Sequence, residues 1–460
     1  MAPALASIIF TIGILGLFYL DPSRGARIIT PLWIPAAWLF LISSRPASFW
    51  CGITPDFSSV DATAVYVEGS PFDRNVFFLL LLAGLAVLIA RRTKVKRLLR
   101  QNITIILYLL FCAISIVWSD FPFVALKRWI KAAGEFGIVL ILLTEPAPLK
   151  SLKRLLTGLG FIIFPLSILF IKYYPAIGRR LTMSWTEEAI GVTTQKNELG
   201  LDCMMYGVFF LWLFVSAYKE RKSTSRRRIV AYGTIIAMIV WLLSQCNSTT
   251  SIIGLISAGG VMWFARRRSS KPAAVHLLVV AVLGLATTAL FFNPGGDMVQ
   301  ALGKDPSLTG RRQIWGMVLA MHTNPWVGTG FESFWLGPRL EQMRTALPNF
   351  PINEAHDAYL EVYLNLGWIG VCFIALLLGT AYKELASNIR RDPAKASLFL
   401  GFFLCTLFYS FTEAGFRLMG PSWFFLLLVI GANSQVSMYR TKVRGRRAQM
   451  AKGSPVLELA

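Results

Sequence analysis

The sequence predicts an all-α, polytopic integral membrane protein with about 12–13 transmembrane helices and one large loop on the outer side. Three observations predict this fold class. The chain of 460 residues is 55% hydrophobic and only 15% charged, with a mean hydropathy of +0.57, whereas a soluble chain carries far more charge. Its apolar residues gather in runs of about 16–22, enough to cross a hydrocarbon core roughly 30 Å thick. Basic residues recur in every second loop between these runs.

The apolar runs follow one another along the chain and divide it into four parts. The first ten runs lie at 4–20, 28–43, 76–90, 103–118, 130–143, 155–171, 198–217, 229–245, 249–265 and 274–292, and three more at 357–381, 398–412 and 422–436. The first run has neither a charged n-region nor a small-residue cleavage site, so we interpret it as a membrane span. We therefore expect helices 1–10 in residues 1–292, a large loop at 293–356, helices 11–13 in residues 357–438 and a basic tail at 439–460.

The net charge of +22 comes from basic clusters that sit in alternate loops. These clusters lie at 91–100, 218–228, 266–271, 382–395 and 440–447. Positively charged loops stay in the cytoplasm, so the C-terminus is expected there and the 293–356 loop on the opposite side of the membrane. The charge then marks topology and attraction to the anionic lipid bilayer, and we expect no nucleic-acid partner.

The outer loops are the longer ones, at 44–75, 119–129, 172–197 and 293–356. Binding and catalytic groups concentrate in irregular segments on a rigid scaffold, so we expect the working face on the outside. ATP is out of reach there, and the chain has no Walker-type glycine loop. Several basic residues remain within a turn or two of a span on this side, among them Lys127, Arg128, Lys131, Lys196, Arg311 and Arg312. They predict contact with an anionic lipid headgroup, because arginine binds phosphate oxygens through its planar fork.

The stretch "HDAYLEVYLNLGWIG" at 356–370 carries polar residues into an apolar helix. The spacing places His356, Tyr359, Tyr363, Gly367 and Gly370 on one helical stripe, with glycines that let a neighbouring helix come close. A histidine at the outer mouth of a helix exchanges a proton near neutral pH. An interfacial histidine beside an ordinary aromatic belt fits the spacing equally well. The glycine-marked "VGTGFESF" at 327–334 is either a structural turn, which we favour, or a place where backbone amides approach a ligand.

Several motifs in fixed order carry a resemblance to a known family. They are "SIVWSDFP" at 115–122, "GVTTQKNELG" at 191–200, "SQCNSTTS" at 244–251, "TGRRQIW" at 309–315, "NPWVGTGFESF" at 324–334 and the 356–370 stretch. With them the sequence resembles the O-antigen ligase and polymerase superfamily of bacterial envelope enzymes, and within it the succinoglycan-type exopolysaccharide polymerases. Asp357 stands where ligases usually carry an amide or serine, which argues against a ligase.

The resemblance implies a multi-pass protein of the bacterial inner membrane with its active site facing the periplasm. It implies a metal-independent, inverting glycosyltransferase that polymerises undecaprenyl-pyrophosphate-linked oligosaccharide repeat units for exopolysaccharide or O-antigen biosynthesis. No cofactor is implied, and His276, His322 and His356 are too scattered to predict a metal site. Chain-length regulator and flippase proteins are the implied partners.

Two alternatives stay open. A ligase would transfer the lipid-linked glycan to the lipid A core of lipopolysaccharide. A flippase or exporter of lipid-linked oligosaccharide would show repeated halves and helices broken at mid-membrane, whereas here the polar groups crowd one surface.

The implied chemistry assigns roles to particular residues. Arg311 or Arg312, with Lys196, is expected to stabilise the leaving pyrophosphate, and Asn197, Arg128 and Tyr359 complete the predicted substrate-binding set. His356 is expected to take the proton of the acceptor hydroxyl, oriented by Asp357 or Glu354. His356 and Asp357 are therefore the predicted catalytic residues.

Overall fold

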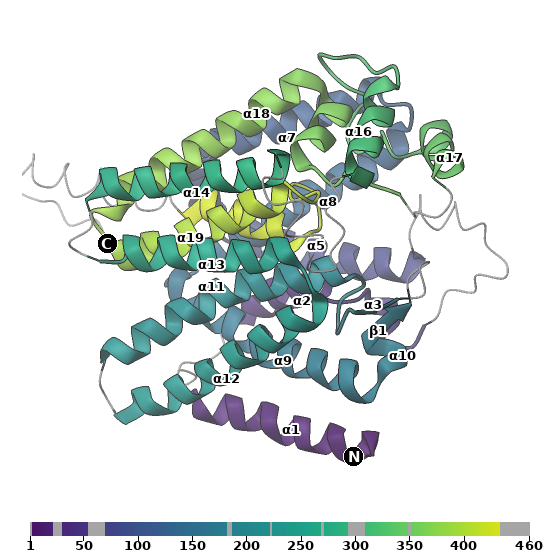
Figure 1. The fold of residues 1–460 in the computed structure, drawn as a ribbon. Coiled ribbons are helices and arrows are strands. Elements are labelled where there is room, and N and C mark those ends of the chain that lie inside the picture. Colours follow the sequence, from purple (N-terminus) through teal and green to yellow (C-terminus); the bar gives the residue numbers. More distant parts are fainter. Residues whose placement is uncertain are drawn as a thin grey trace, which may run out of the picture.

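The computed structural model describes residues 2–21, 30–53, 70–181, 186–220, 223–267, 271–292, 309–347 and 352–432. Helices dominate these residues, as the sequence predicts (Figure 1). They are α1 (Pro3–Leu20), α2 (Trp33–Ile42), α3 (Ala47–Trp50), α5 (Pro71–Ala90), α6 (Arg92–Gln101), α7 (Ile103–Ile114), α8 (Pro122–Leu143), α9 (Pro148–Tyr173), α10 (Pro175–Gly178), α11 (Lys196–Glu220), α12 (Ser223–Cys246), α13 (Thr249–Ala265), α14 (Pro272–Phe292), α16 (Thr309–Ala320), α17 (Gly337–Ala346), α18 (Ala358–Ile389) and α19 (Pro393–Ser410). A further helix spans Pro421–Ala432.

The protein is a multi-pass membrane protein, with fewer full-length spans than the apolar runs predict. Among the described residues seven helices, α1, α5, α9, α11, α12, α18 and α19, are long and apolar enough to cross a membrane, or eight if α6 and the following Ile103–Trp118, bent by 88°, form one span. The predicted runs at 28–43, 249–265 and 422–436 correspond to shorter apolar helices within the described residues, and the run at 274–292 corresponds to α14. The run at 130–143 is the second half of α8, whose first half is charged. The count covers the described residues only, and among them apolar composition alone does not fix helix length.

The bundle has central and peripheral helices. Within their most apolar windows α11 is 78% buried and α19 is 83% buried, whereas α1 and α5 are each 11% buried. α11 packs against α12 and α13, and α19 packs against α13 and α18. A helix that is apolar all round is either buried in protein or faces lipid. The central helices therefore form the core, and α1 and α5 present their apolar side chains to the bilayer.

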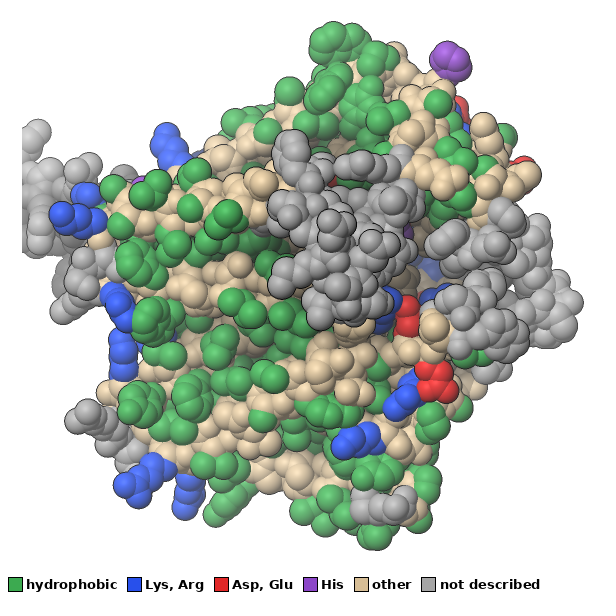
Figure 2. Space-filling model, viewed as in Figure 1, with side chains coloured by type: hydrophobic (Ala, Val, Ile, Leu, Met, Phe, Trp, Pro, Cys, Tyr) green, Lys and Arg blue, Asp and Glu red, His purple; other side chains and the backbone are tan. Residues whose placement is uncertain are grey.

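The two ends of the bundle differ in charge. Figure 2 shows mainly Lys and Arg among the charged side chains at the end where α11 and α12 are joined, and hydrophobic side chains along the flank. Acidic side chains appear at the opposite end, where Figure 1 places α16, α17, α10 and β1. This agrees with the alternation of basic loops from which we predict topology. We refer to the end with α16 and α17 as the outer end.

The outer end is folded. Two short strands, β1 (Arg179–Leu181) and β2 (Glu187–Ala189), pair antiparallel and are the described exception to the all-helical prediction. The described part of the predicted 293–356 loop contains α16 and α17. With the start of α18 these helices enclose a second hydrophobic cluster, which includes Ile314, Val318, Phe334 and Leu364. This separate core lets the outer segment hold side chains in fixed positions.

The break in α18 at Gly367 explains how the outer segment is attached. Gly367 has φ 63° and ψ −166°, a conformation that is open essentially only to glycine. Residues beside the break receive the preceding loop: Trp368 N donates to Pro325 O at 2.9 Å, and Ile369 N donates to Trp326 O at 3.1 Å. A Cβ on Gly367 would lie 2.2 Å from the carbonyl carbon of Trp326. The predicted close approach therefore occurs, but the partner is a loop and not a neighbouring helix.

The glycine-marked turn at 327–334 uses its amides within the protein. Thr329 N donates to Leu364 O at 3.1 Å, and Gly330 N donates to Asn365 O at 2.9 Å. The amides of Ser333 and Phe334 donate to Asn365 Oδ1 at 2.8 and 3.0 Å. These contacts support the structural interpretation of the turn, because the amides that a ligand would need are already paired with α18.

Substitution of Gly367 tests this attachment. We expect Gly367→Ala to destabilise the protein by at least about 2 kcal/mol, because alanine resists this conformation and its Cβ would overlap the loop backbone. Gly379→Ala is the matched control in the same helix, where an added Cβ meets nothing within 4 Å. Thermal unfolding in detergent measures both variants. Equal melting temperatures for the two would contradict this account of the break.

Candidate functional site

His356 does not lie on the helical stripe that the spacing predicts. It precedes α18 and has a left-handed backbone with φ 52°, a conformation in which histidine is tolerated better than most residues. Asp357 caps α18 instead: its side chain accepts hydrogen bonds from Tyr359 N at 2.9 Å and Leu360 N at 2.8 Å. Of the two residues predicted to orient His356, Asp357 makes its described hydrogen bonds to the helix backbone, and Glu354 is the one that contacts the ring.

Two other carboxylates hold His356. Its Nδ1 lies 2.9 Å from Glu413 Oε2 and 3.1 Å from Glu354 Oε1. The Glu413 side chain is only 7% exposed, whereas that of His356 is 30% exposed. Among the described residues no hydrogen bond to Nε2 is found. The ring is therefore fixed through one nitrogen while the other remains available.

Glu413 joins four segments of the chain. Besides His356 Nδ1, its carboxylate accepts from Arg311 Nη2 at 3.1 Å and from Asn197 Nδ2 at 2.8 Å. Arg311 lies on α16, Asn197 begins α11, and Glu413 follows α19. Three residues that the sequence places in the site are thus brought together by a fourth that it does not single out.

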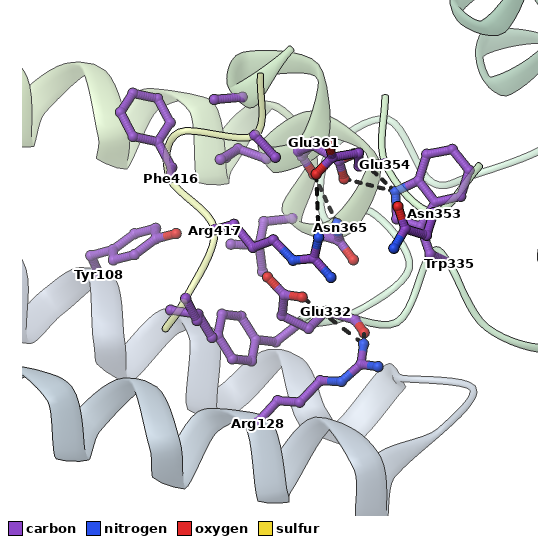
Figure 3. A pocket seen from close by; sticks show the side chains of 16 residues that line it. Tyr108, Arg128, Glu332, Trp335, Asn353, Glu354, Glu361, Asn365, Phe416 and Arg417 are labelled. Atoms are coloured by element: carbon purple, nitrogen blue, oxygen red, sulfur yellow. Dashed lines mark hydrogen bonds and ion pairs between the residues drawn. The ribbon is translucent and has the colours of Figure 1, made fainter. Parts of the chain in front are cut away.

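The partners of Glu354 and His356 are themselves held in place. Arg417 Nη1 donates to Glu354 Oε2 at 3.2 Å, and Figure 3 shows its guanidinium pointing toward Glu354. Trp315 Nε1 donates to Ala355 O at 2.9 Å, which fixes the segment beside His356. Arg311 and Trp315 therefore turn the same face of α16 toward this segment, as their spacing of four predicts.

The contacts set the protonation of the cluster. Burial lowers the pKa of His356, but its hydrogen bonds and ion pairs with Glu354 and Glu413 outweigh this and raise that pKa above its ordinary value. Burial raises the pKa of Glu354, while His356 and Arg417 outweigh this and lower that pKa. With His356 protonated, two carboxylates face three cations, namely the imidazolium, Arg311 and Arg417. The cluster then has one net positive charge, which favours a polyanionic ligand.

The remaining predicted residues lie in other surroundings. Lys196 Nζ pairs with Glu188 Oε1 at 2.6 Å, away from the cluster contacts. Arg128 donates to the carbonyl oxygen of Glu332. The Tyr359 ring packs against Phe411 and Phe416 at centroid distances of 5.6 and 5.3 Å, so it supports the segment that carries Glu413. The side chain of Arg312 lies outside the described residues.

A small cavity of about 50 Å³ adjoins the cluster, lined in part by Arg128, Glu332, Glu354 and Arg417 (Figure 3). Glu361 also lines it and accepts a hydrogen bond from Trp335 Nε1 at 2.8 Å. The same carboxylate accepts from the amide of Ala355. Glu361 thus connects α18 to the segment that carries His356.

Sequence reasoning missed Glu413 and Arg417. They are the two charged residues between Lys395 and Arg440, a stretch that otherwise contains two apolar runs. The available signal was an acidic and a basic residue, four positions apart, in the short connection between two apolar runs. Charged groups near a membrane are retained where they have partners, so these two were candidates for the site.

The cluster also offers donors of a metal site. Ligand atoms of Glu354, His356 and Glu413 lie within 4.8 Å of one another, and imidazole with carboxylates suits several divalent ions. Glu413 already pairs with Arg311, and Glu354 pairs with Arg417. The raised pKa of His356 also opposes the neutral imidazole that a metal ion requires. The net positive charge of the cluster around His356 therefore favours binding of an anion over binding of a metal cation.

Comparison with known proteins connects this geometry to a family. Residues 235–375 match the family model described as O-Antigen ligase. The match covers less than half of the chain. It includes α16, His356 and the first half of α18, and the match confirms the resemblance found in the motifs. The chain is also 26% identical over 308 residues to the exopolysaccharide production protein ExoQ of Rhizobium meliloti (strain 1021). That alignment covers 64% of this chain and 68% of ExoQ.

The raised pKa of His356 predicts how its contribution to stability varies with pH. Protonation favours the folded state, so this stabilisation is complete below the unfolded pKa near 6.5 and is lost as pH rises through the higher folded pKa. We expect His356→Asn, which tolerates the left-handed backbone, to cost about 2 kcal/mol at pH 6 and progressively less at alkaline pH. Unfolding of wild type and variant in detergent at several pH values measures this difference.

His322→Asn is the control, because His322 is exposed and outside the cluster. A stability difference for His356→Asn that stays constant or grows toward alkaline pH would contradict the assigned contacts.

Proposed function

We propose that this protein is a membrane glycosyltransferase that polymerises undecaprenyl-pyrophosphate-linked oligosaccharide repeat units on the periplasmic face of the bacterial inner membrane. The product would be an exopolysaccharide or O-antigen. The family match and the similarity to ExoQ support this class of reaction. The observation that carries the proposal is a histidine held by two carboxylates beside Arg311 and Arg417, at the outer end of the bundle.

The reaction would be a direct displacement at the anomeric carbon of the donor glycan. A hydroxyl oxygen of the acceptor forms the new glycosidic bond, and the bond between the anomeric carbon and the pyrophosphate oxygen breaks. The bonding electrons leave with undecaprenyl pyrophosphate, and the hydroxyl proton passes to His356 Nε2. Such a displacement inverts the anomeric centre.

The cations of the cluster match the charge that develops on the leaving group. Arg311 and Arg417 are each anchored by one carboxylate, so their guanidinium groups are positioned before the donor arrives. Fixed cations stabilise a developing phosphate charge without reorganisation during the reaction. This assignment keeps Arg311 from the sequence prediction and adds Arg417, while Lys196 is already paired with Glu188.

His356 would act in its neutral form, with Nδ1–H donating to a carboxylate and Nε2 accepting the hydroxyl proton. Carboxylate partners fix the ring orientation and strengthen the base. They also reduce the neutral fraction at neutral pH, because they raise the pKa of His356. Transfer should therefore speed up as pH rises toward that pKa.

The ligase alternative differs only in the acceptor, which would be a sugar of the lipid A core. The printed name of ExoQ, an exopolysaccharide production protein, favours a polymerase. A flippase needs no proton acceptor, so the hydrogen-bonded His356 favours transfer over transport.

The periplasmic orientation rests on the charge of the two ends. Basic clusters lie in alternate loops, and the acidic side chains seen in Figure 2 lie at the outer end with α16 and α17. Under this orientation the chain divides as the sequence suggests, with the outer segment 293–356 between two groups of membrane helices and the basic tail 439–460 in the cytoplasm. The tail lies outside the described residues.

Reconstitution with a lipid-linked oligosaccharide tests the function. We expect wild type to produce a ladder of products, and His356→Asn and Arg311→Gln each to lower the rate at least about 100-fold, the usual range for an acid–base group. His322→Asn is the matched control and should retain full activity. A single product on a lipid A core acceptor would identify a ligase, and a donor that crosses the bilayer unconsumed would identify a transporter. We expect EDTA to leave the rate unchanged.

The pH profile of the same assay tests the base. The wild-type rate should rise with pH on the alkaline side of neutrality, and Glu413→Gln should move this rise to lower pH because one carboxylate is removed. A rate that falls as pH rises would mean that His356 works as a cation and would exclude it as the base.

A further inference from the structure

A second and larger cavity lies between α5 and α8, beside the site already described. Its volume is about 410 Å³. Five basic residues line it: Arg74 on α5, Lys127, Arg128 and Lys131 on α8, and Arg417. Its apolar walls include Phe77, Phe78 and Ile130. The cavity therefore combines a dense positive charge with an apolar surface.

Two of the five cations, Arg128 and Arg417, pair with Glu332 and Glu354, and the other three have no such partner among the described residues. Arg74, Lys127 and Lys131 take part in no ion pair in the described part of the chain, although Lys131 lies within electrostatic reach of the two others and of Arg128. The nearby Asp73 accepts hydrogen bonds from Ser48 N and Oγ, both at 2.8 Å. Like charges gathered without partners are unfavourable, so the groove favours an anionic ligand.

The apolar part of the groove opens toward the lipid-facing flank of the bundle. Phe78 is 57% exposed and Ile130 is 47% exposed, and α5 is one of the peripheral helices. On α5, Arg74 lies in the first turn and Phe77, Phe78 and Leu81 follow toward the helix interior. A ligand that fits must therefore carry several negative charges on a long apolar chain that enters from the membrane.

We propose that this groove binds the isoprenoid-pyrophosphate end of the lipid-linked donor, an assignment that rests on the proposed function. Arg74, Lys127 and Lys131 contact the pyrophosphate oxygens, for which guanidinium and ammonium groups are suited. The first isoprene units lie along Phe77, Phe78 and Ile130. This site assigns three basic residues that the cluster around His356 does not use.

The groove is continuous with the reacting centre. Arg128, Glu332, Arg417 and Leu418 line both this groove and the cavity of Figure 3. Arg417 contacts Glu354 at 3.2 Å. Glu354 in turn contacts His356 at 3.1 Å. A pyrophosphate at this junction places the attached sugar on the side of His356.

Two residues in the wall of the groove have an unusual backbone conformation. Glu332 and Met419, which both line the groove, have φ of 53° and 60°. Such left-handed backbone at residues other than glycine is uncommon and gathers at ligand sites. Met419 N donates to Glu135 Oε2 at 2.9 Å, which fixes this wall against α8.

Binding of undecaprenyl pyrophosphate, measured without any sugar transfer, tests the groove. The full chain is reconstituted in phosphatidylcholine nanodiscs, and the bound lipid is measured by native mass spectrometry. We expect the triple variant Arg74→Gln, Lys127→Gln and Lys131→Gln to weaken binding at least about tenfold, about 1.4 kcal/mol. Arg180→Gln is the matched control, because Arg180 is an exposed outer-end arginine on β1 outside the groove.

Further measurements separate the possible occupants. Phosphatidylglycerol at the same mole fraction and free inorganic pyrophosphate should each displace the lipid poorly, because the site requires the isoprenoid and the pyrophosphate together. The proposal is overturned if the triple variant binds as wild type does, or if either competitor displaces the lipid as well as unlabelled undecaprenyl pyrophosphate. Unchanged thermal unfolding of the triple variant shows that its loss of binding is local.

The groove and the proposed function can fail separately. His356→Asn should bind undecaprenyl pyrophosphate as wild type does while transferring no sugar, and the triple variant should raise KM for the donor more than it lowers kcat. If wild type binds undecaprenyl pyrophosphate more tightly than the triple variant but transfers no sugar, the proposed function is rejected and the lipid-binding groove is retained. Transfer with a wild-type KM by the triple variant would reject the groove and keep the function.

Discussion

The buried carboxylate of Glu413 is the contact on which the outer end depends. It accepts from Arg311, Asn197 and His356 at 3.1, 2.8 and 2.9 Å, and so ties α16, α11 and the segment before α18 to the connection after α19. A carboxylate that is 7% exposed is stable only when paired, and loss of one partner of a buried pair costs about 3–5 kcal/mol. Glu354 and Glu413 together therefore set the position and protonation of His356.

The same contact relates the family region to the rest of the chain. Arg311, Glu354 and His356 lie inside the matched residues 235–375, whereas Asn197, Glu413 and Arg417 lie outside them. The proposed site is thus assembled from both parts, and the matched region alone would lack the contacts that Glu413 makes with Arg311 and His356 and that Arg417 makes with Glu354. The break at Gly367 supports this arrangement, because it seats the loop at 325–330 against α18 and with it the second hydrophobic cluster of the outer end.

Much of the architecture follows from sequence, and the pairing of side chains does not. Apolar runs predict helices, because a membrane leaves few other ways to satisfy the backbone, and the spacing of Arg311 and Trp315 correctly predicts a shared face. The span count was less accessible, since α6, which the sequence places in a basic loop, is a helix that meets the next predicted run at a bend of 88°. Asp357 illustrates the limit for the site: its place next to His356 suggests a catalytic partner, but adjacent residues point apart, and the contact is made by Glu413, 57 residues away.

A double-mutant cycle between Arg311 and Glu413 tests the central contact most directly. The unfolding free energies of wild type, Arg311→Gln, Glu413→Gln and the double variant are compared in the same detergent at neutral pH. A charged pair in contact should give a coupling energy of about 1–3 kcal/mol, with the double variant less destabilised than the sum of the single ones. Additive effects, within about 0.5 kcal/mol, would show that the two residues are not in contact and would contradict the assembly of the site around Glu413.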